Sequence, residues 1–169
     1  SVAIRGATSA AVLWGVQSFR QLLPPDFERR GGARRAAWRV APVRVDDAPR
    51  FSWRGSMVDV GRHFFPVRDI KRHIDLLSRY KLNIFHWHLT DDQGWRLEIR
   101  RFPALARVGG RRTEATGDRY AGFYTQAEAR EVVEYARQRG VTVVPEIEMP
   151  GHSSAALAAY PQLGCTGET

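Results

Sequence analysis

The sequence predicts a parallel α/β fold, in which strands and helices alternate along the chain. Short runs rich in strand-forming residues are separated by stretches whose apolar residues repeat with a helical period. The longest loops follow the strands, and the polar residues gather in those loops. In parallel α/β proteins, ligands bind at the carboxyl ends of the strands. The order strand, helix, strand, long excursion, helix, strand therefore predicts a parallel sheet with a site at one end.

The first 48 residues are expected to be the C-terminal part of a small α+β domain. Residues 2–6 look like the end of a strand, and a helix is expected to follow from Thr8 or Ser9. Pro24 and Pro25 should end this helix. Its apolar stripe consists of Val12, Val16, Phe19 and Leu23.

A polar loop and a second strand complete this first part. Residues 26–37 are rich in Gly and Arg, and residues 38–45 alternate between apolar and polar like a surface strand. One helix and two strands are too little for an independent domain, so we expect the domain to begin upstream of Ser1. Residues 46–50 are interpreted as the linker.

Residues 49–169 are expected to hold three strand–helix units. The strands are predicted at 51–60, 82–88 and 141–147. A closed barrel of eight such units needs about 250 residues, so this part is expected to end before a fourth strand. The helix after the first strand should begin beyond Pro66, with an apolar stripe at Val67, Ile70, Ile74 and Leu77.

The excursion after the second strand has weaker signals. Residues 95–99 are predicted to be extended, 102–108 helical or irregular, and 109–122 a loop. Thr125 and Glu128 form a capping box at the start of the next helix. That helix should bury Ala129, Val132, Val133 and Ala136 and end at Gly140, and Ser153 or Ser154 should cap a short helix that stops at Pro161.

The second strand and the turn after it, KLNIFHWHLTDDQGW at 81–95, carry the strongest chemical signal. Side chains alternate along a strand, so His86 and His88 point to one face. Asp91 and Asp92 follow at the carboxyl end. Buried imidazoles and carboxylates need partners, which indicates a site. The alternative is a hydrogen-bonded histidine pair above a solvated turn.

Composition excludes some classes of protein. The net charge of +8 comes almost entirely from arginines that are scattered among acidic residues. The densest basic cluster, 29–35, has no aromatic residue for base stacking, so we expect no nucleic-acid partner. Cys165 is the single cysteine, which leaves no internal disulfide and no cysteine-based metal site. No apolar run approaches the ~20 residues of a membrane span.

Three long motifs resemble one enzyme family. Residues 54–66, RGSMVDVGRHFFP, 86–95, HWHLTDDQGW, and 145–153, PEIEMPGHS, are similar to the first three strand motifs of the family 20 glycoside hydrolases, the β-N-acetylhexosaminidases. Residues 15–23, GVQSFRQLL, are similar to the end of the small domain that precedes the barrel in that family.

This resemblance implies a (β/α)8 TIM barrel that removes terminal N-acetylglucosamine or N-acetylgalactosamine with retention. The implied mechanism is substrate-assisted: the acetamide oxygen of the sugar attacks the anomeric carbon and forms an oxazolinium ion. In the family, an adjacent Asp-Glu pair at the fourth strand orients the acetamide and protonates the leaving oxygen. No catalytic residue of that pair is present in this chain, so we expect the pair downstream and the fragment alone to be inactive.

The resemblance also implies roles for residues that are present. Arg62 matches the arginine that holds the sugar hydroxyls, and Asp91 and His152 match a pair behind the catalytic glutamate. Arg54 is left unassigned. Residues expected to support the site or line its wall are His86, His88, Asp92, Trp95 and Glu146.

The expected partners are oligosaccharides or glycoconjugates that contain N-acetylhexosamine, with no cofactor. The native N-terminus is expected to be missing because the chain starts at Ser1; family members often act outside the cytoplasm, so a periplasmic or secreted location is favoured. The sequence does not distinguish gluco from galacto preference or define the oligomeric state.

Two alternatives remain open at this stage. One is a metal-dependent barrel hydrolase, because His86 and His88 with Asp91 and His152 resemble the ligands of a zinc site. The other is a non-catalytic sugar-binding remnant that keeps Arg62.

Overall fold

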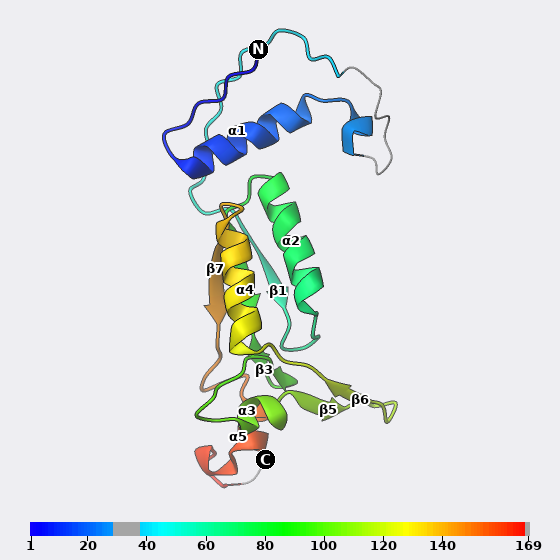
Figure 1. The fold of residues 1–169 in the computed structure, drawn as a ribbon. Coiled ribbons are helices and arrows are strands. Elements are labelled where there is room, and N and C mark those ends of the chain that lie inside the picture. The colour runs from blue at the N-terminus through cyan, green and yellow to red at the C-terminus, as the bar shows by residue number, and fades with distance from the viewer. Residues whose placement is uncertain (29–37, 168–169) are drawn as a thin grey trace.

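A three-stranded parallel sheet forms the centre of the protein, seen here in a computed structural model that describes residues 1–28 and 38–167. The strands are β1 (Gly55–Asp59), β2 (Ile84–His88) and β7 (Thr142–Glu146), in the order β1-β2-β7 (Figure 1). Both neighbouring pairs are parallel. The prediction of a parallel α/β arrangement is therefore confirmed, and each strand is shorter than the predicted range.

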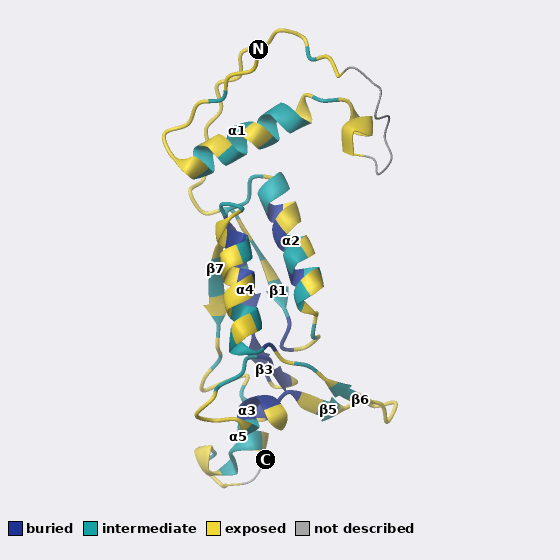
Figure 2. Cartoon of the chain, viewed as in Figure 1, coloured by how far each residue is buried: buried dark blue, intermediate teal, exposed yellow. Residues whose placement is uncertain are grey.

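Two helices cover one face of this sheet. Helices α2 (Val67–Arg79) and α4 (Gln126–Arg137) pack side by side across it. Phe85 and Trp87 of β2 point toward them, and both side chains are almost fully buried. Figure 2 shows the buried stripes of these helices turned toward the sheet, where they place Ile70, Ile74, Leu77, Val132 and Ala136.

The sequence prediction for α4 is correct except at one position. Thr125 and Glu128 form the capping box, and Gly140 has the positive φ of a helix-ending glycine. Val133 was expected in the buried stripe but is 50% exposed. Successive helical residues are about 100° apart, and burying Val132 turns Val133 toward solvent.

The opposite face of the sheet is not covered by any of the described helices. Met57, His86 and Val144 are register partners on this face, and Met57 is 52% exposed. Two residues further along the strands, Asp59, His88 and Glu146 form the next row of register partners on this face, at the carboxyl ends of the strands.

The N-terminal part contains helix α1 (Ser9–Gln21) and the short 3-10 helix η1 (Pro25–Glu28). Thr8 caps α1 through its side-chain oxygen, which accepts from the backbone of Ala11. The strands expected at 2–6 and 38–45 are not formed, because no described segment pairs with them. The basic cluster at 29–35 lies outside the described residues.

This N-terminal part contacts the amino-terminal end of the sheet. Arg54 lies over the ring of Trp14, and Lys81 reaches both Ser18 and Asp47 at 2.7 Å. The guanidinium of Arg54 donates to the backbone carbonyls of Lys81 and Phe51, and its backbone N–H donates to the side-chain oxygen of Asn83.

Smaller elements gather beyond the carboxyl ends of the strands. Strands β3 (Thr90–Asp91) and β4 (Gly94–Trp95) pair with each other, and the helices α3 (Ala104–Arg107) and α5 (Ser154–Ala159) contact each other. The 3-10 helix η2 (Pro161–Leu163) is the last helix of the described segment.

The prediction of a loop at 109–122 is wrong. It contains the antiparallel hairpin of β5 (Arg111–Thr113) and β6 (Arg119–Ala121). Gly117, with a φ of 86°, lies in its turn. None of the described helices is long and apolar enough to cross a bilayer.

Candidate active site

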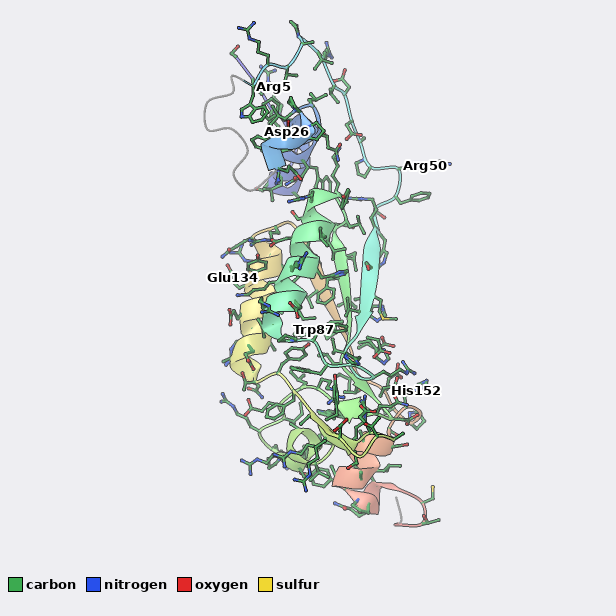
Figure 3. All side chains as sticks on the ribbon, turned by 90° about the vertical axis from the view of Figure 1, so that its right-hand side faces the viewer. Arg5, Asp26, Arg50, Trp87, Glu134 and His152 are labelled. Atoms are coloured by element: carbon green, nitrogen blue, oxygen red, sulfur yellow. The ribbon has the colours of Figure 1, made fainter. Side chains whose placement is uncertain are left out.

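Three strands bring three ionisable side chains into one row at the carboxyl end of the sheet. Asp59 is the register partner of His88, and His88 is the register partner of Glu146. In Figure 3, His152 lies beside this end of the sheet, on the side away from the helices. The topology therefore collects groups from β1, β2, β7 and the loops that follow them.

The carboxylate of Asp91 is the centre of the site, and its side chain is completely buried. Oδ2 lies 2.9 Å from both His88 Nε2 and Arg62 Nη2. Oδ1 lies 3.2 Å from His152 Nδ1 and accepts from the backbone N–H of Asp92 at 2.7 Å. Four nitrogen partners compensate for the burial of this charge.

His88 connects Asp91 to Glu146. Its other ring nitrogen, Nδ1, lies 2.7 Å from Glu146 Oε2. Burial alone would lower the pKa of His88, but the hydrogen bonds to Glu146 and Asp91 outweigh burial and raise this pKa. The raised pKa favours the imidazolium form between the two acids.

Glu146 receives several hydrogen bonds. Burial would raise its pKa, but hydrogen bonds from Glu148 and His88 outweigh that effect and lower the pKa to about 2. His86 Nε2 also lies 2.6 Å from Glu146 Oε2. The pKa of Glu148 is raised, because its carboxyl group shares a hydrogen bond with the Glu146 carboxylate.

Arg62 occupies the rim of the site and is fixed by two acids. Nη1 donates to Asp59 Oδ2 at 2.6 Å, and Nη2 pairs with Asp91. The backbone N–H of Arg62 also donates to Asp59. Its side chain remains 47% exposed, which leaves donors available to a ligand.

His152 and Asp92 form the opposite rim. His152 adopts a left-handed backbone with a φ of 51°, and this places its Nδ1 against Asp91. Asp92 accepts from the backbone and hydroxyl of Ser154 at the start of α5. These hydrogen bonds lower the pKa of Asp92.

Trp95, expected to support the site or line its wall, is a packed core residue in the structure. It is buried with Leu105 and Ala155, and its indole N–H donates to the carbonyl of Leu97. Its contacts connect the turn after β2 with α3 and α5.

Sequence reasoning missed Arg96, a completely buried arginine beneath the site. Its guanidinium donates to the backbone carbonyls of Val60, Gly61, Gly110 and Gly122, so it ties the β1 loop to the β5–β6 hairpin. At Gly94, a side chain would collide with this guanidinium, a constraint that only the structure reveals.

The predicted zinc ligands do not converge as one set. Among the described residues, His88 groups with Glu146 and Glu148, whereas His152 groups with Asp91 and Asp92. Both ring nitrogens of His88 already face carboxylates, and Asp91 is paired with the Arg62 cation. The arrangement therefore favours an ion-paired hydrogen-bond network over a metal centre.

Comparisons with known proteins agree on one family. Residues 51–169 match the model of "Glycosyl hydrolase family 20, catalytic domain". A beta-hexosaminidase of Porphyromonas gingivalis is 51% identical over 164 residues, which cover 97% of this chain and 21% of that protein. A beta-N-acetylhexosaminidase of Cellulomonas fimi is 48% identical over 129 residues, 76% of this chain and 26% of that protein.

Solved structures give the same result. A mutant beta-hexosaminidase of Streptomyces plicatus in complex with its product GlcNAc matches with a TM-score of 0.88 and 50% identity. The match covers 95% of this chain and 32% of that one. The N-acetyl-beta-hexosaminidase of the same organism in complex with thio-NAglucal matches with a TM-score of 0.86 and 51% identity. The chain thus spans about a third or less of these relatives.

Proposed function

The chain belongs to glycosyl hydrolase family 20, and from this premise we propose that it is part of a β-N-acetylhexosaminidase. The proposed reaction is hydrolysis of terminal, non-reducing N-acetylglucosamine or N-acetylgalactosamine with retention of configuration. Support comes from relatives named as beta-hexosaminidases and from a similar structure that holds GlcNAc.

The proposal includes how the chain is divided. Residues 49–169 would form the first three strand–helix units of a (β/α)8 barrel, and residues 1–48 the end of a small α+β domain. The parallel order β1-β2-β7 and the uncovered face at Met57 suit a barrel, in which this face would point inward. Further strands would have to come from a longer protein.

In the proposed mechanism, the acetamide oxygen of the substrate attacks the anomeric carbon while the glycosidic bond breaks. An acid protonates the leaving oxygen, and water then opens the oxazolinium ion. The adjacent Asp-Glu pair that would orient the acetamide and act as this acid is proposed to lie downstream of Thr169. Within this chain, the free donors of Arg62 would bind neighbouring hydroxyls of the terminal sugar.

Asp91 and His152 would act through the downstream acid. Asp91 holds Nδ1 of His152, so the other ring nitrogen would be free to face the proposed downstream acid. Such a pair can tune the acid and exchange its proton as the acid alternates between the two steps.

One observation carries the proposal: Arg62 and His152, from loops 90 residues apart, meet on the two oxygens of buried Asp91. Asp91 would thereby fix the position of the sugar-holding Arg62 relative to the proton-relaying His152. Such fixed positioning suits a sugar-binding subsite with an adjoining general acid.

The test is hydrolysis of a chromogenic N-acetylglucosaminide by the whole protein that carries this segment. We expect turnover with the β-anomer as first product, and inhibition by a thiazoline analogue of the oxazolinium ion. Arg62→Ala should mainly raise KM, and His152→Ala should mainly lower kcat. Binding of the sugar with no turnover would support a sugar-binding remnant and contradict the proposal.

The isolated segment provides a second comparison. β1 and β7 each have one hydrogen-bonded neighbour in the sheet, so both are edge strands. We expect residues 1–169 alone to be inactive on the same substrate and to aggregate readily. Turnover by this segment would refute the proposal that the catalytic pair lies downstream.

A further inference from the structure

His88 was expected only to support the site, yet it is the residue that links the groups of three strands. It lies 2.9 Å from Asp91 and 2.7 Å from Glu146, and its Nε2 is 4.0 Å from Asp59 Oδ1. Its side chain is 8% exposed, so water does little to screen these charges.

The hydrogen-bond pattern determines where the protons are. Both oxygens of Asp91 already accept: Oδ2 from Arg62, and Oδ1 from the backbone of Asp92. An ionised carboxylate is an acceptor only, so the ring nitrogen that faces Asp91 must carry a hydrogen.

The same reasoning applies on the other side of the ring. Glu146 Oε2 faces ring nitrogens of both His86 and His88. The pKa of Glu146 is lowered to about 2, which makes its carboxylate an acceptor at neutral pH. A neutral imidazole has a single N–H and could donate to only one of the two acids.

We propose that His88 is a charged positioning residue, an imidazolium at neutral pH that holds the Asp91 carboxylate in the orientation that Arg62 and His152 require. This inference rests on the proposed function for its catalytic consequence. The charge state itself follows from the contacts and can be tested without substrate.

The proposal specifies an effect on pH dependence. The acids around His88 are Asp59 of β1, Asp91 of β3 and Glu146 of β7, and Glu148 is hydrogen-bonded to Glu146. Two further cationic or titratable groups contact these acids: Arg62 pairs with Asp59, and His86 pairs with Glu146. Three acids within 4.0 Å stabilise the cation, so the pKa of His88 is raised above its ordinary value.

The first test measures the protonation of His88 in the whole protein by NMR of isotope-labelled histidine over a range of pH. We expect both ring nitrogens of His88 to carry protons at pH 7. His73 of α2 is the internal control. It is half-buried beside Phe85 of β2, and burial lowers the pKa of His73. A neutral His88 at pH 7 would overturn the proposal whatever the enzyme does.

The second test uses Glu146→Gln, which keeps the shape of the side chain and removes its charge. The apparent pKa of His88 in the NMR titration should fall in this variant. An unchanged titration would contradict the role assigned to Glu146 in holding the cation.

The third test is kinetic and uses His88→Gln, which cannot donate to both acids. We expect kcat to fall by about 10²-fold, the cost of a misplaced catalytic group. The acidic limb of the kcat/KM profile should also move to higher pH, because Glu146 loses the hydrogen bond from His88 that helps to lower its pKa. His73→Gln is the matched control and should leave both unchanged.

The outcomes separate the two proposals. A wild-type protein with a charged His88 and no turnover would refute the proposed function but support the charge assignment. A His88→Gln variant that stays folded, with an unchanged acidic limb, would overturn the positioning role.

Discussion

Arg112 Nη1 donates a hydrogen bond of 2.9 Å to the backbone carbonyl of Arg62. The Arg112 guanidinium also lies 4.3 Å from the centre of the Tyr120 ring and pairs with Glu114. The β5–β6 hairpin, which the sequence analysis expected to be a loop, therefore supports the residue proposed to bind the sugar.

Replacing Arg112 with Met should loosen Arg62 without removing it. We expect KM for the glycoside to rise by about tenfold in the whole protein, with a smaller change in kcat, because Asp91 and His152 keep their contacts. Steady-state kinetics measures both. Arg111→Met is the control, since Arg111 is exposed on the same hairpin. An equal effect in both variants would argue against a specific role for Arg112.

Replacing Arg96 with Met should destabilise the protein strongly. The variant removes the guanidinium donors from the carbonyls of Val60, Gly61, Gly110 and Gly122, at a cost of about 3 kcal/mol or more in the free energy of unfolding. Chemical denaturation measures the loss. The exposed Arg100 is the control, and Arg100→Met should change stability by less than about 0.5 kcal/mol. Equal stability of the two variants would contradict this assignment.

Thr125→Ala should remove the capping box of α4. The hydroxyl accepts from the backbone N–H of Glu128 at 3.1 Å, so its loss should cost about 1 kcal/mol. Thr125→Ser keeps the hydroxyl and should restore most of the difference. Denaturation midpoints of the three proteins test this, and a Ser variant as unstable as the Ala variant would show that the methyl group matters instead.

Glu146→Gln should change stability in a way that depends on pH. The folded pKa of Glu146 is lowered to about 2 from 4.5, so its contribution is present above about pH 4.5 and is lost as the pH falls toward 2. The folded pKa of His88 is raised from 6.5, so its contribution is present below about pH 6.5 and is lost as the pH rises through the raised value.

The two contributions overlap between about pH 4.5 and 6.5. The difference in unfolding free energy between wild type and Glu146→Gln should be largest in this window and should shrink toward pH 2. Thermal or chemical denaturation at several pH values would measure it. A difference that stays constant from pH 2 to 6 would show that charge at Glu146 does not stabilise the fold.

Periodicity was sufficient for the parts of the fold whose contacts are regular. The stripe at Ile70, Ile74 and Leu77 and the capping box at Thr125 were predicted because helix packing and capping leave a local signal. The strand expected at 38–45 had the right alternation, but alternation does not supply a neighbour to pair with.

The site was only partly accessible to sequence reasoning. Motif resemblance identified Arg62, Asp91 and His152, and the structure brings the three together. Arg96 was missed because arginine is normally a surface residue, and its partners at Gly61, Gly110 and Gly122 are far apart in the sequence. No local pattern reports a contact made to main-chain oxygens.

The main-chain contacts of Arg96 have a consequence for protein engineering. The anchor's hydrogen bonds go to the backbone on either side of the hairpin, and the one hairpin ring under its guanidinium is Tyr120, so exposed positions such as Arg111, Thr113 and Arg119 can be randomised without disturbing it. A library at these three positions could vary the surface beside Arg62, the arginine proposed to bind the sugar, while the loop stays in place. The hairpin is thus a suitable site for engineering the surface around Arg62.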